Sequence, residues 1–229
     1  MRRALLRTGA GAAVALLCGC GHTDNITSVN PAGGIVGSGV LASESRPVSG
    51  FDAVTVDAPF HVLLTPGGGE SLQVTAEDNV LPLVQSEVRG GRLFLGLVPH
   101  GNLTLTREIL CRVTVAEIRD FDASGAARIE IKGVEAAGLG VRLSGAAAGS
   151  AGGAVGHLTL DLTGASRWSA VDLRSQTVAA NVSGASYALV RAVESLVANV
   201  SGASTLEYAG DPAVEQTVSG TSVLRRVGP

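Results

Sequence analysis

The residue types that could support catalysis or metal binding are few in this sequence, and their spacing is unfavourable. The histidines are scattered, without the His-x-x-x-His spacing of a zinc site. Glycines 67–69 precede Glu70 and lack the lysine and hydroxyl residue that complete a phosphate-binding loop. No Gly-x-Ser-x-Gly motif marks a nucleophilic serine. We therefore predict no enzyme activity, no cofactor and no metal site. The histidines are His22, His61, His100 and His157.

One cysteine near the N-terminus has the surroundings of a lipid attachment site. Three arginines precede a short apolar run over residues 10–18, which is the order of a secretory signal peptide and too short to span a bilayer. The run ends in Leu-Cys-Gly-Cys at 17–20, which resembles a bacterial lipobox. By that resemblance Cys20 becomes the lipidated first residue of the mature protein and anchors it to a membrane. An ordinary signal peptide is the alternative.

The residue after this cysteine bears on localisation. Gly21 stands where proteins retained at the inner membrane of proteobacteria usually carry an aspartate. We therefore predict an outer membrane lipoprotein of the cell envelope, either periplasmic or surface-exposed. After processing, only Cys20 and Cys111 remain, so no disulfide framework is expected, and Cys111 is predicted to be a buried small side chain.

The composition limits the size of the fold and the kinds of ligand that the protein is expected to bind. The chain has 229 residues, 45% of them hydrophobic, which is enough for one well-buried domain. Its net charge is −3 without a basic stripe, so the sequence gives no electrostatic support for nucleic-acid binding. Aromatic residues make up only 3%, which leaves few platforms for stacking against a ligand.

A tetrad of the type Ser-Gly-Ala-Ser recurs along the second half of the chain. Successive glycines of the tetrads are 20, 19, 20, 18 and 18 residues apart. A period near 20 indicates stacked supersecondary units. The six glycines are Gly125, Gly145, Gly164, Gly184, Gly202 and Gly220.

The residues on both sides of each tetrad alternate between apolar and polar types. Phe121, Asp122 and Ala123 precede the first tetrad in this pattern, which is the period of a strand with one buried face. After later tetrads the alternation resumes, and Trp168 and Ala170 are predicted to point inward. Each tetrad therefore joins two short strands. The sequence predicts an all-β fold, a single-stranded parallel β-helix (β-solenoid) with roughly 18–20 residues per coil.

Stacked coils place equivalent residues about 4.8 Å apart, so they form columns along the rod. Glycine suits the crowded corners because it tolerates unusual backbone angles. Asp122, Arg142 and Asp161 fall in one outward column, where alternating charges neutralise one another. Tyr187 is the outward aromatic of the later coils. The candidate polar binding ladder consists of Asn181, Asn199, Ser183, Ser201, Ser186 and Ser204.

The sequence divides into three segments. Residues 1–19 are the predicted lipoprotein signal peptide, and residues 20–45, rich in Gly, Ser, Asn and Thr, are predicted to form a flexible tether. The β-helix domain is predicted over residues 46–229. Within it, the stretch from Ala146 to Gly156 is almost entirely Gly and Ala, which predicts either a loose coil or a protruding loop.

Two of these features together resemble the bacterial "putative auto-transporter adhesin, head GIN domain" family. One is the segment from Arg46 to Leu97, with its Arg-x-Val-x-x-Phe opening and Asp-Asn-x-x-Pro motif, and the other is the tetrad series through Ser222. The resemblance implies a right-handed β-helix in an exported protein, often a lipoprotein. It implies no enzymatic activity for any named residue here.

We therefore expect a non-catalytic envelope lipoprotein whose β-helix domain acts as an adhesin or binding module through repetitive polar faces. Its partners would be a membrane, through the lipid anchor, and a protein or a glycan. Two alternatives stay open: a polysaccharide-acting enzyme, with a carboxylate groove near Ala146–Gly156, and a purely structural scaffold. Self-association through a bare end of the rod is a further expectation, which Arg225, Arg226 and Pro229 would oppose.

Overall fold

The computed structural model describes residues 34–99 and 101–228, of which 66% are in β-strands. The predicted signal peptide and the candidate lipidation site Cys20 lie outside the described residues. Within the described ranges, no helix has the length and apolar content needed to cross a bilayer. The elements are β1 (Ile35–Val36), β2 (Leu41–Arg46), β3 (Ala53–Asp57), β4 (Phe60–Pro66), β5 (Ser71–Glu77), the 3-10 helix η1 (Leu81–Leu83), β6 (Val84–Arg89), β7 (Arg92–Leu97), β8 (Leu103–Thr104), β9 (Ile109–Val115), β10 (Asp120–Ser124), β11 (Arg128–Leu143), β12 (Ala148–Leu162), β13 (Arg167–Val182), β14 (Tyr187–Val200), β15 (Thr205–Ala209), β16 (Ala213–Val218) and β17 (Val223–Arg226).

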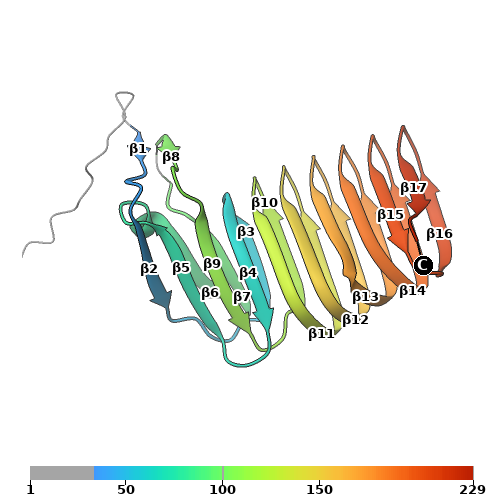
Figure 1. Cartoon of the computed structure of the whole chain (residues 1–229), viewed down its shortest axis with the longest axis horizontal. Coiled ribbons are helices and arrows are strands. Elements are labelled where there is room, and N and C mark those ends of the chain that lie inside the picture. The colour runs from blue at the N-terminus through green and yellow to red at the C-terminus, as the bar shows by residue number, and fades with distance from the viewer. Residues whose placement is uncertain (1–33, 100, 229) are drawn as a thin grey trace, which may run out of the picture.

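From β10 to the C-terminus the chain winds as a β-solenoid, which confirms the predicted fold class (Figure 1). Each coil runs along one sheet to a tetrad corner and returns along a second sheet, and every strand pairs in parallel with its equivalent in the next coil. We call these the first and second sheets. The first sheet consists of β6, β7, β3, β10, the second halves of β11–β14, and β16. The second sheet consists of β2, β5, β9, β4, the first halves of β11–β14, β15 and β17.

The tetrad glycines occupy the corners between the two sheets and lie over one another. The N–H of Ala203 donates to the carbonyl oxygen of Gly184 at 2.8 Å, so Gly184 and Gly202 are on adjacent rungs. All six glycines have φ between +71° and +82°, a region in which other L-residues are strained. A Cβ added to Gly184 would lie 2.5 Å from the Gly164 carbonyl oxygen. Both the backbone angle and the stacking therefore require glycine.

The glycine-rich stretch at Ala146–Gly156 forms an ordered strand, and a protruding loop is absent at this point of the described chain. Its small residues have a packing role. Gly149 is paired in register with Trp168 of the following coil, whose ring is fully buried. A Cβ at Gly149 would lie 2.7 Å from the Trp168 ring. Gly149 therefore lacks a side chain because the indole occupies that volume. At Gly153 and Gly156 an added Cβ would instead lie 2.1 Å and 2.6 Å from backbone carbonyl oxygens of the preceding coil.

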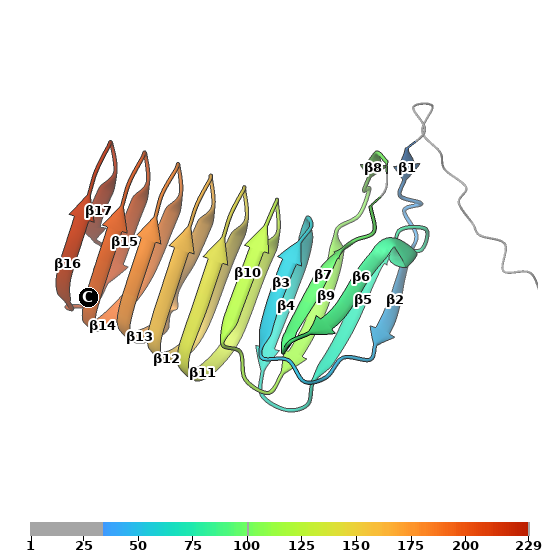
Figure 2. The same cartoon turned by 180° about the vertical axis from the view of Figure 1, so that it is seen from behind.

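The N-terminal part departs from the predicted single-stranded coil. β5 pairs antiparallel with β9 and with β2, and β6 pairs antiparallel with β7. β9 lies between β4 and β5, although β4 and β5 follow each other in sequence (Figures 1 and 2). Alternation identifies strands but carries no information on their direction or their partners. The predicted tether through residue 45 also needs correction, because β1 and most of β2 lie within it.

A buried carboxylate holds two loops at this end of the rod. Glu77 is only 1% exposed, and it accepts hydrogen bonds from the backbone N–H groups of Gly39 (2.7 Å), Thr106 (3.1 Å) and Arg107 (3.3 Å). Burial opposes ionisation, but the Thr106 hydroxyl and these N–H groups outweigh it, so the pKa of Glu77 is lowered. The charged form therefore fastens the segments before β2 and after β8.

We expect Glu77→Gln to lower the free energy of unfolding by about 1–3 kcal/mol near neutral pH, because the loop N–H donors lose a charged acceptor. The pKa of Glu77 is lower in the folded chain than in the unfolded chain. Its stabilisation is therefore complete above the unfolded-state pKa and is lost as the pH falls through the folded-state value. Urea denaturation at several pH values should show the two proteins converging in acid. A difference that stays constant with pH would contradict this role.

Candidate functional site

One column of outward side chains crosses the first sheet from β7 to β16, and we call it the central column. Strand pairing makes neighbours of residues that are far apart in sequence, since Thr55 lies beside Asp122. Further along the sheet, Asn199 lies beside Thr217. Figure 2 views the molecule from the side of this sheet. In spatial order the column consists of Phe94, Thr55, Asp122, Arg142, Asp161, Asn181, Asn199 and Thr217.

The charged part of the central column is internally neutralised. Arg142 Nη1 lies 3.2 Å from Asp122 Oδ1, and Arg142 Nε lies 3.7 Å from Asp161 Oδ2. Arg92 Nη1 approaches the other oxygen of Asp122 at 2.7 Å. The charged ladder predicted from the sequence is therefore present. Both aspartates act as ion-pair partners, which is a structural use of the carboxylates.

The polar part of the central column continues as a chain of amide hydrogen bonds. Asn181 Nδ2 donates to Asp161 Oδ1 at 2.7 Å, and Asn199 Nδ2 donates to Asn181 Oδ1 at 3.0 Å. Both asparagines are exposed. Each amide uses part of its hydrogen-bonding capacity along the column, and the remaining capacity faces solvent. This segment can therefore bind a polar ligand without breaking the ladder.

The predicted serines of the ladder fall into two groups. Ser183 and Ser201 are half-buried at the edge of the first sheet. Ser186 and Ser204 are 2% and 1% exposed, and the Ser186 hydroxyl donates to the Ser183 carbonyl oxygen at 2.8 Å. The prediction that Ser186 and Ser204 belong to a binding surface is therefore wrong, because their hydroxyls stabilise the inside of the corner.

The aromatic end of the central column was missed by the sequence analysis. Phe94 is 39% exposed, whereas Leu93 and Leu95 beside it are buried. Their alternation was readable in the sequence, but this strand lies in the irregular part of the chain, where neighbouring columns cannot be inferred. Tyr187, the predicted outward aromatic, lies on the second sheet. It is half-buried, and its ring is 5.9 Å from the guanidinium carbon of Arg167.

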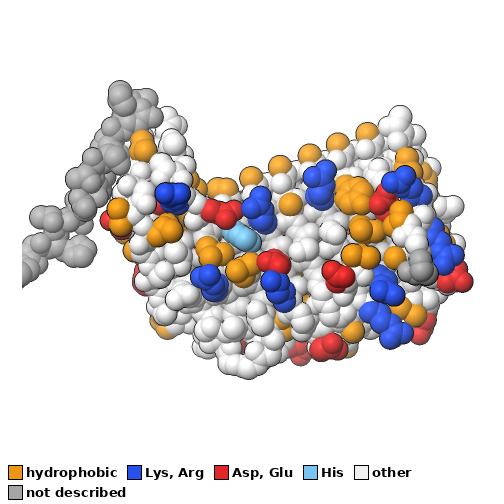
Figure 3. Space-filling model, in the orientation of Figure 1, with side chains coloured by type: hydrophobic (Ala, Val, Ile, Leu, Met, Phe, Trp, Pro, Cys, Tyr) orange, Lys and Arg blue, Asp and Glu red, His pale blue; other side chains and the backbone are white. Residues whose placement is uncertain are grey.

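Tyr187 is already engaged within the chain. Its hydroxyl donates to Glu207 Oε2 at 2.7 Å, and Arg225 Nε donates to the other carboxylate oxygen at 2.7 Å. Burial, and then the bond to Glu207, raise the pKa of Tyr187. The same hydroxyl and Arg225 lower the pKa of Glu207. In the orientation of Figure 3, charges of both signs are interspersed along the rod, so this side offers no single-sign surface.

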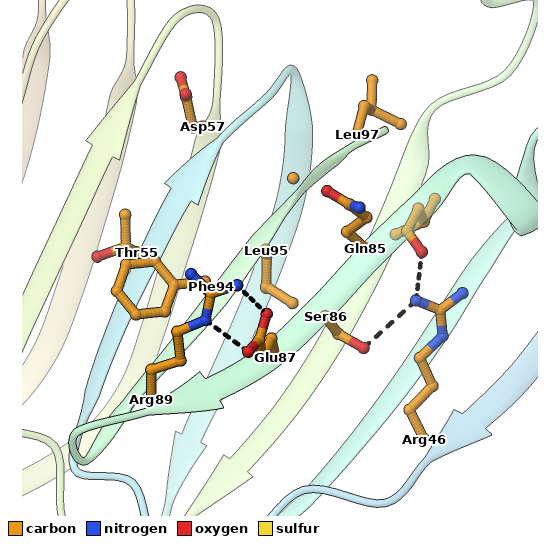
Figure 4. Close-up of a pocket in the computed structure, with 12 residues that line it drawn as sticks. Arg46, Thr55, Asp57, Gln85, Ser86, Glu87, Arg89, Phe94, Leu95 and Leu97 are labelled. Atoms are coloured by element: carbon orange, nitrogen blue, oxygen red, sulfur yellow. Dashed lines mark hydrogen bonds and ion pairs between the residues drawn. The ribbon is translucent and has the colours of Figure 1, made fainter. Parts of the chain in front are cut away.

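Three shallow hollows lie next to residues of the central column on the first sheet. One hollow, of about 530 Å³, adjoins Phe94 and Thr55 and is bounded by Arg46, Gln85 and the Arg89–Glu87 ion pair (Figure 4). A second, of about 310 Å³, lies over Asp122, Arg142 and Asp161. A third, of about 480 Å³, lies beside Arg142 and His157. The described residues contain no group of His, Cys, Asp or Glu arranged to hold a metal ion.

Two of the remaining sequence predictions concern cysteines. Cys111 is fully buried in the core, and burial raises its pKa to about 12, so the thiol is an inert core side chain. The candidate lipidation site, Cys20, lies outside the described residues.

Comparisons with known proteins agree with this architecture. A family model described as "Putative auto-transporter adhesin, head GIN domain" matches residues 50–212. A "putative adhesin" from Bacteroides fragilis NCTC 9343 is similar in structure, with a TM-score of 0.69 and 20% identity over 85% of this chain and 100% of that chain. A "putative lipid binding protein" from Parabacteroides distasonis ATCC 8503 has a TM-score of 0.55 and 16% identity over 85% and 99% of the two chains. At these identities the likeness shows the fold alone. No protein with a curated description matches the chain.

Proposed function

The chain belongs to the "putative auto-transporter adhesin, head GIN domain" family, and from this premise we propose that it is a non-catalytic, adhesin-like binding module of the cell envelope. We propose further that it binds a glycan along the central column of the first sheet. The observation that carries this proposal is the unbroken register from Phe94 to Thr217 across one sheet.

The chemistry of the central column suits a polyhydroxylated ligand. Its side chains offer carboxylate and amide oxygens as acceptors, and guanidinium, amide and hydroxyl groups as donors. They recur about every 4.8 Å, so one extended ligand can contact several rungs. Individually weak contacts then add through effective concentration. This is the manner of binding expected of an adhesin rather than of a deep catalytic pocket.

Phe94 provides an aromatic surface, which the polar side chains of the central column do not offer. Sugar rings have an apolar face, and exposed aromatic side chains commonly stack on it. Phe94 stands between Thr55 of the central column and Glu87 of β6, beside the hollow of about 530 Å³. The ligand can therefore stack on the phenyl ring and hydrogen-bond to the amides further along.

The alternative of a polysaccharide-acting enzyme finds less support. The acid–base pair of such an enzyme needs carboxyl groups that are free to exchange protons. Asp122 is held by Arg92 and Arg142, and Asp161 by Arg142 and Asn181. Such an enzyme was expected to have its groove near Ala146–Gly156. Most of this stretch instead belongs to the regular strand β12.

The N-terminal motif supports a proposal for the location of the protein. We propose that residues 1–19 direct export, that Cys20 is lipidated and that the lipid fixes the rod to the outer membrane. The segment from 21 to about 34 would then be the tether, since β1 begins at Ile35. Such an anchor holds many parallel rods on one surface and multiplies their contacts with an extended glycan.

Binding of residues 34–229 to an array of immobilised bacterial and host glycans tests the proposal. We expect Phe94→Ala to weaken binding about tenfold, which corresponds to about 1.4 kcal/mol of lost contact. Replacing Asn181 and Asn199 together by alanine should weaken it by a similar factor, because two adjacent rungs lose their donors.

Arg167→Ala, on the second sheet, is the matched control and should leave binding unchanged. An equal loss in this control would contradict the assignment to the first sheet. If no glycan binds, envelope proteins are the next partners to test. Failure of both classes would favour the purely structural scaffold.

A further inference from the structure

The C-terminal end of the rod finishes in two edge strands. Among the described residues, β16 pairs only with β14, and β17 pairs only with β15. Every residue of β16 is exposed. Edge strands present a row of backbone groups that can pair with another chain. Here two such strands, one at the end of each sheet, close the rod (Figure 1).

The orientation of the open backbone groups follows from the hydrogen bonds that are made. The N–H of Ser219 donates to the Val200 carbonyl oxygen, and the N–H of Val223 donates to that of Ser204, both at 2.9 Å. Successive residues of a parallel strand direct their groups to opposite sides. Gln216 and Leu224, which are an odd number of residues away, therefore point their N–H and C=O groups out of the rod.

The core is also uncovered at this end. Val214 and Val218 continue the inward rows of Leu196 and Val200, yet they are 38% and 43% exposed, against 0% and 1% in the coil before. Leu224 continues the row of Leu206 and is only half-buried. A ligand at this end would need to supply both a sheet edge and an apolar surface.

The N-terminal end is built differently. Arg46 and Glu44 occupy inward-facing positions of edge strand β2, opposite the buried Leu72 and Val74. The Arg46 guanidinium crosses to the first sheet, where it donates to the carbonyl oxygens of Leu81, at 3.2 Å, and of Val84. Inward-pointing charges of this kind block edge-to-edge association. The C-terminal edge carries one such charge, Arg226 of β17, which continues the row of Val190 and Tyr208 and pairs with Asp211 at 2.9 Å. The N-terminal edge carries two, so it is the less suited of the two ends to pairing.

The charges of the two edge strands are complementary. β16 carries Glu215 as its single charge, and β17 carries Arg225 and Arg226. Within the chain Arg225 pairs with Glu207 and Arg226 with Asp211, and the remaining donors of Arg225 can serve a second carboxylate. We infer that two copies associate tail to tail about a two-fold axis parallel to the strands. This axis brings β16 of each copy antiparallel to β17 of the other. Glu215 then faces Arg225 of the partner subunit at two equivalent junctions. The interface closes on itself, so a dimer is the end point.

The test uses the full chain, solubilised in a non-ionic detergent, with mass determined by light scattering and length by small-angle X-ray scattering. We expect a concentration-dependent species of about twice the 23.0 kDa chain mass and of nearly doubled length. Gln216→Pro should give monomers, because proline removes an outward N–H while leaving the bonds to β14 intact. Circular dichroism and the melting temperature establish that each variant is folded.

Exchanging the charges at positions 215 and 225 tests the proposed contact between β16 of one copy and β17 of the other. Glu215→Arg and Arg225→Glu should each weaken self-association at least tenfold, and an equimolar mixture of the two should restore it, because both junctions of the mixed dimer regain opposite charges. Glu135→Arg, at an exposed glutamate of β11 in the middle of the rod, is the matched control and should dimerise normally. A monomeric wild-type chain, a filament, or variants that dimerise alone would each overturn the inference. Neither result bears on glycan binding by the first sheet.

Discussion

Trp168→Ala is expected to lower the free energy of unfolding by about 3–5 kcal/mol, the range for deleting a fully buried aromatic side chain. The neighbours of Trp168 in the adjacent coils are Gly149 and Ala188, which have almost no side chain with which to fill the cavity. Urea denaturation followed by circular dichroism measures the loss, because Trp168 is the single tryptophan and fluorescence disappears with it.

Two further variants separate volume from polarity. Trp168 Nε1 is buried, and it lacks a hydrogen-bond partner among the described residues. Trp168→Phe keeps most of the ring and removes this unsatisfied donor, so it should cost much less than alanine. A phenylalanine variant as unstable as the alanine variant would show that the indole N–H has a partner.

Gly149 provides the reciprocal test within the same experiment. In the wild-type chain, Gly149→Ala places a methyl group 2.7 Å from the Trp168 ring, and overpacking of this kind costs about 1–3 kcal/mol. In the Trp168→Ala background the same methyl group enters the cavity and should be neutral or stabilising. Additive effects of the two substitutions would contradict direct packing between these residues.

Gly184→Ala is expected to lower the free energy of unfolding by about 2–4 kcal/mol. Part of the loss, about 1–2 kcal/mol, comes from forcing a residue with a Cβ into a left-handed conformation, since φ is +82°. The rest comes from the stack, because the added Cβ would lie 2.5 Å from the Gly164 carbonyl oxygen. Thermal and urea denaturation of the purified variant measure the change.

Gly125→Ala is the matched control for the stacking component. Gly125 has a φ of +71°, but a Cβ there would meet no atom within 4 Å. Gly125→Ala should therefore lower the free energy of unfolding only by the part that comes from the backbone conformation, about 1–2 kcal/mol. Equal losses at Gly125 and Gly184 would show that the contact between neighbouring corners contributes nothing.

The regular part of this protein was predictable because the repeat carries its own register. Each tetrad fixes a corner, and the fixed distance to the next tetrad brings equivalent residues into one column. The alternation of Phe121, Asp122 and Ala123 then assigns the buried face. The ion pairs of Arg142 and the Asn181–Asn199 bond could be anticipated on that basis alone.

The N-terminal part and the aromatic end of the candidate site could not be anticipated in the same way. No repeat relates β9 to β4 and β5, so nothing local states that β9 lies between them. Phe94 joins the central column only through β3, which is followed in space by β10, more than 60 residues later in sequence. The buried position of Glu77 depends on loops from two distant segments.

The sequence by itself therefore determined the coil, its corners, its buried face and the charged and amide rungs, because these depend on short, repeated spacings. Only the tertiary structure decided which strands run antiparallel, which aromatic side chain is exposed, which serines are buried and which end of the rod is open. Those features depend on pairings between segments far apart in the chain, and local alternation fits several such pairings equally well.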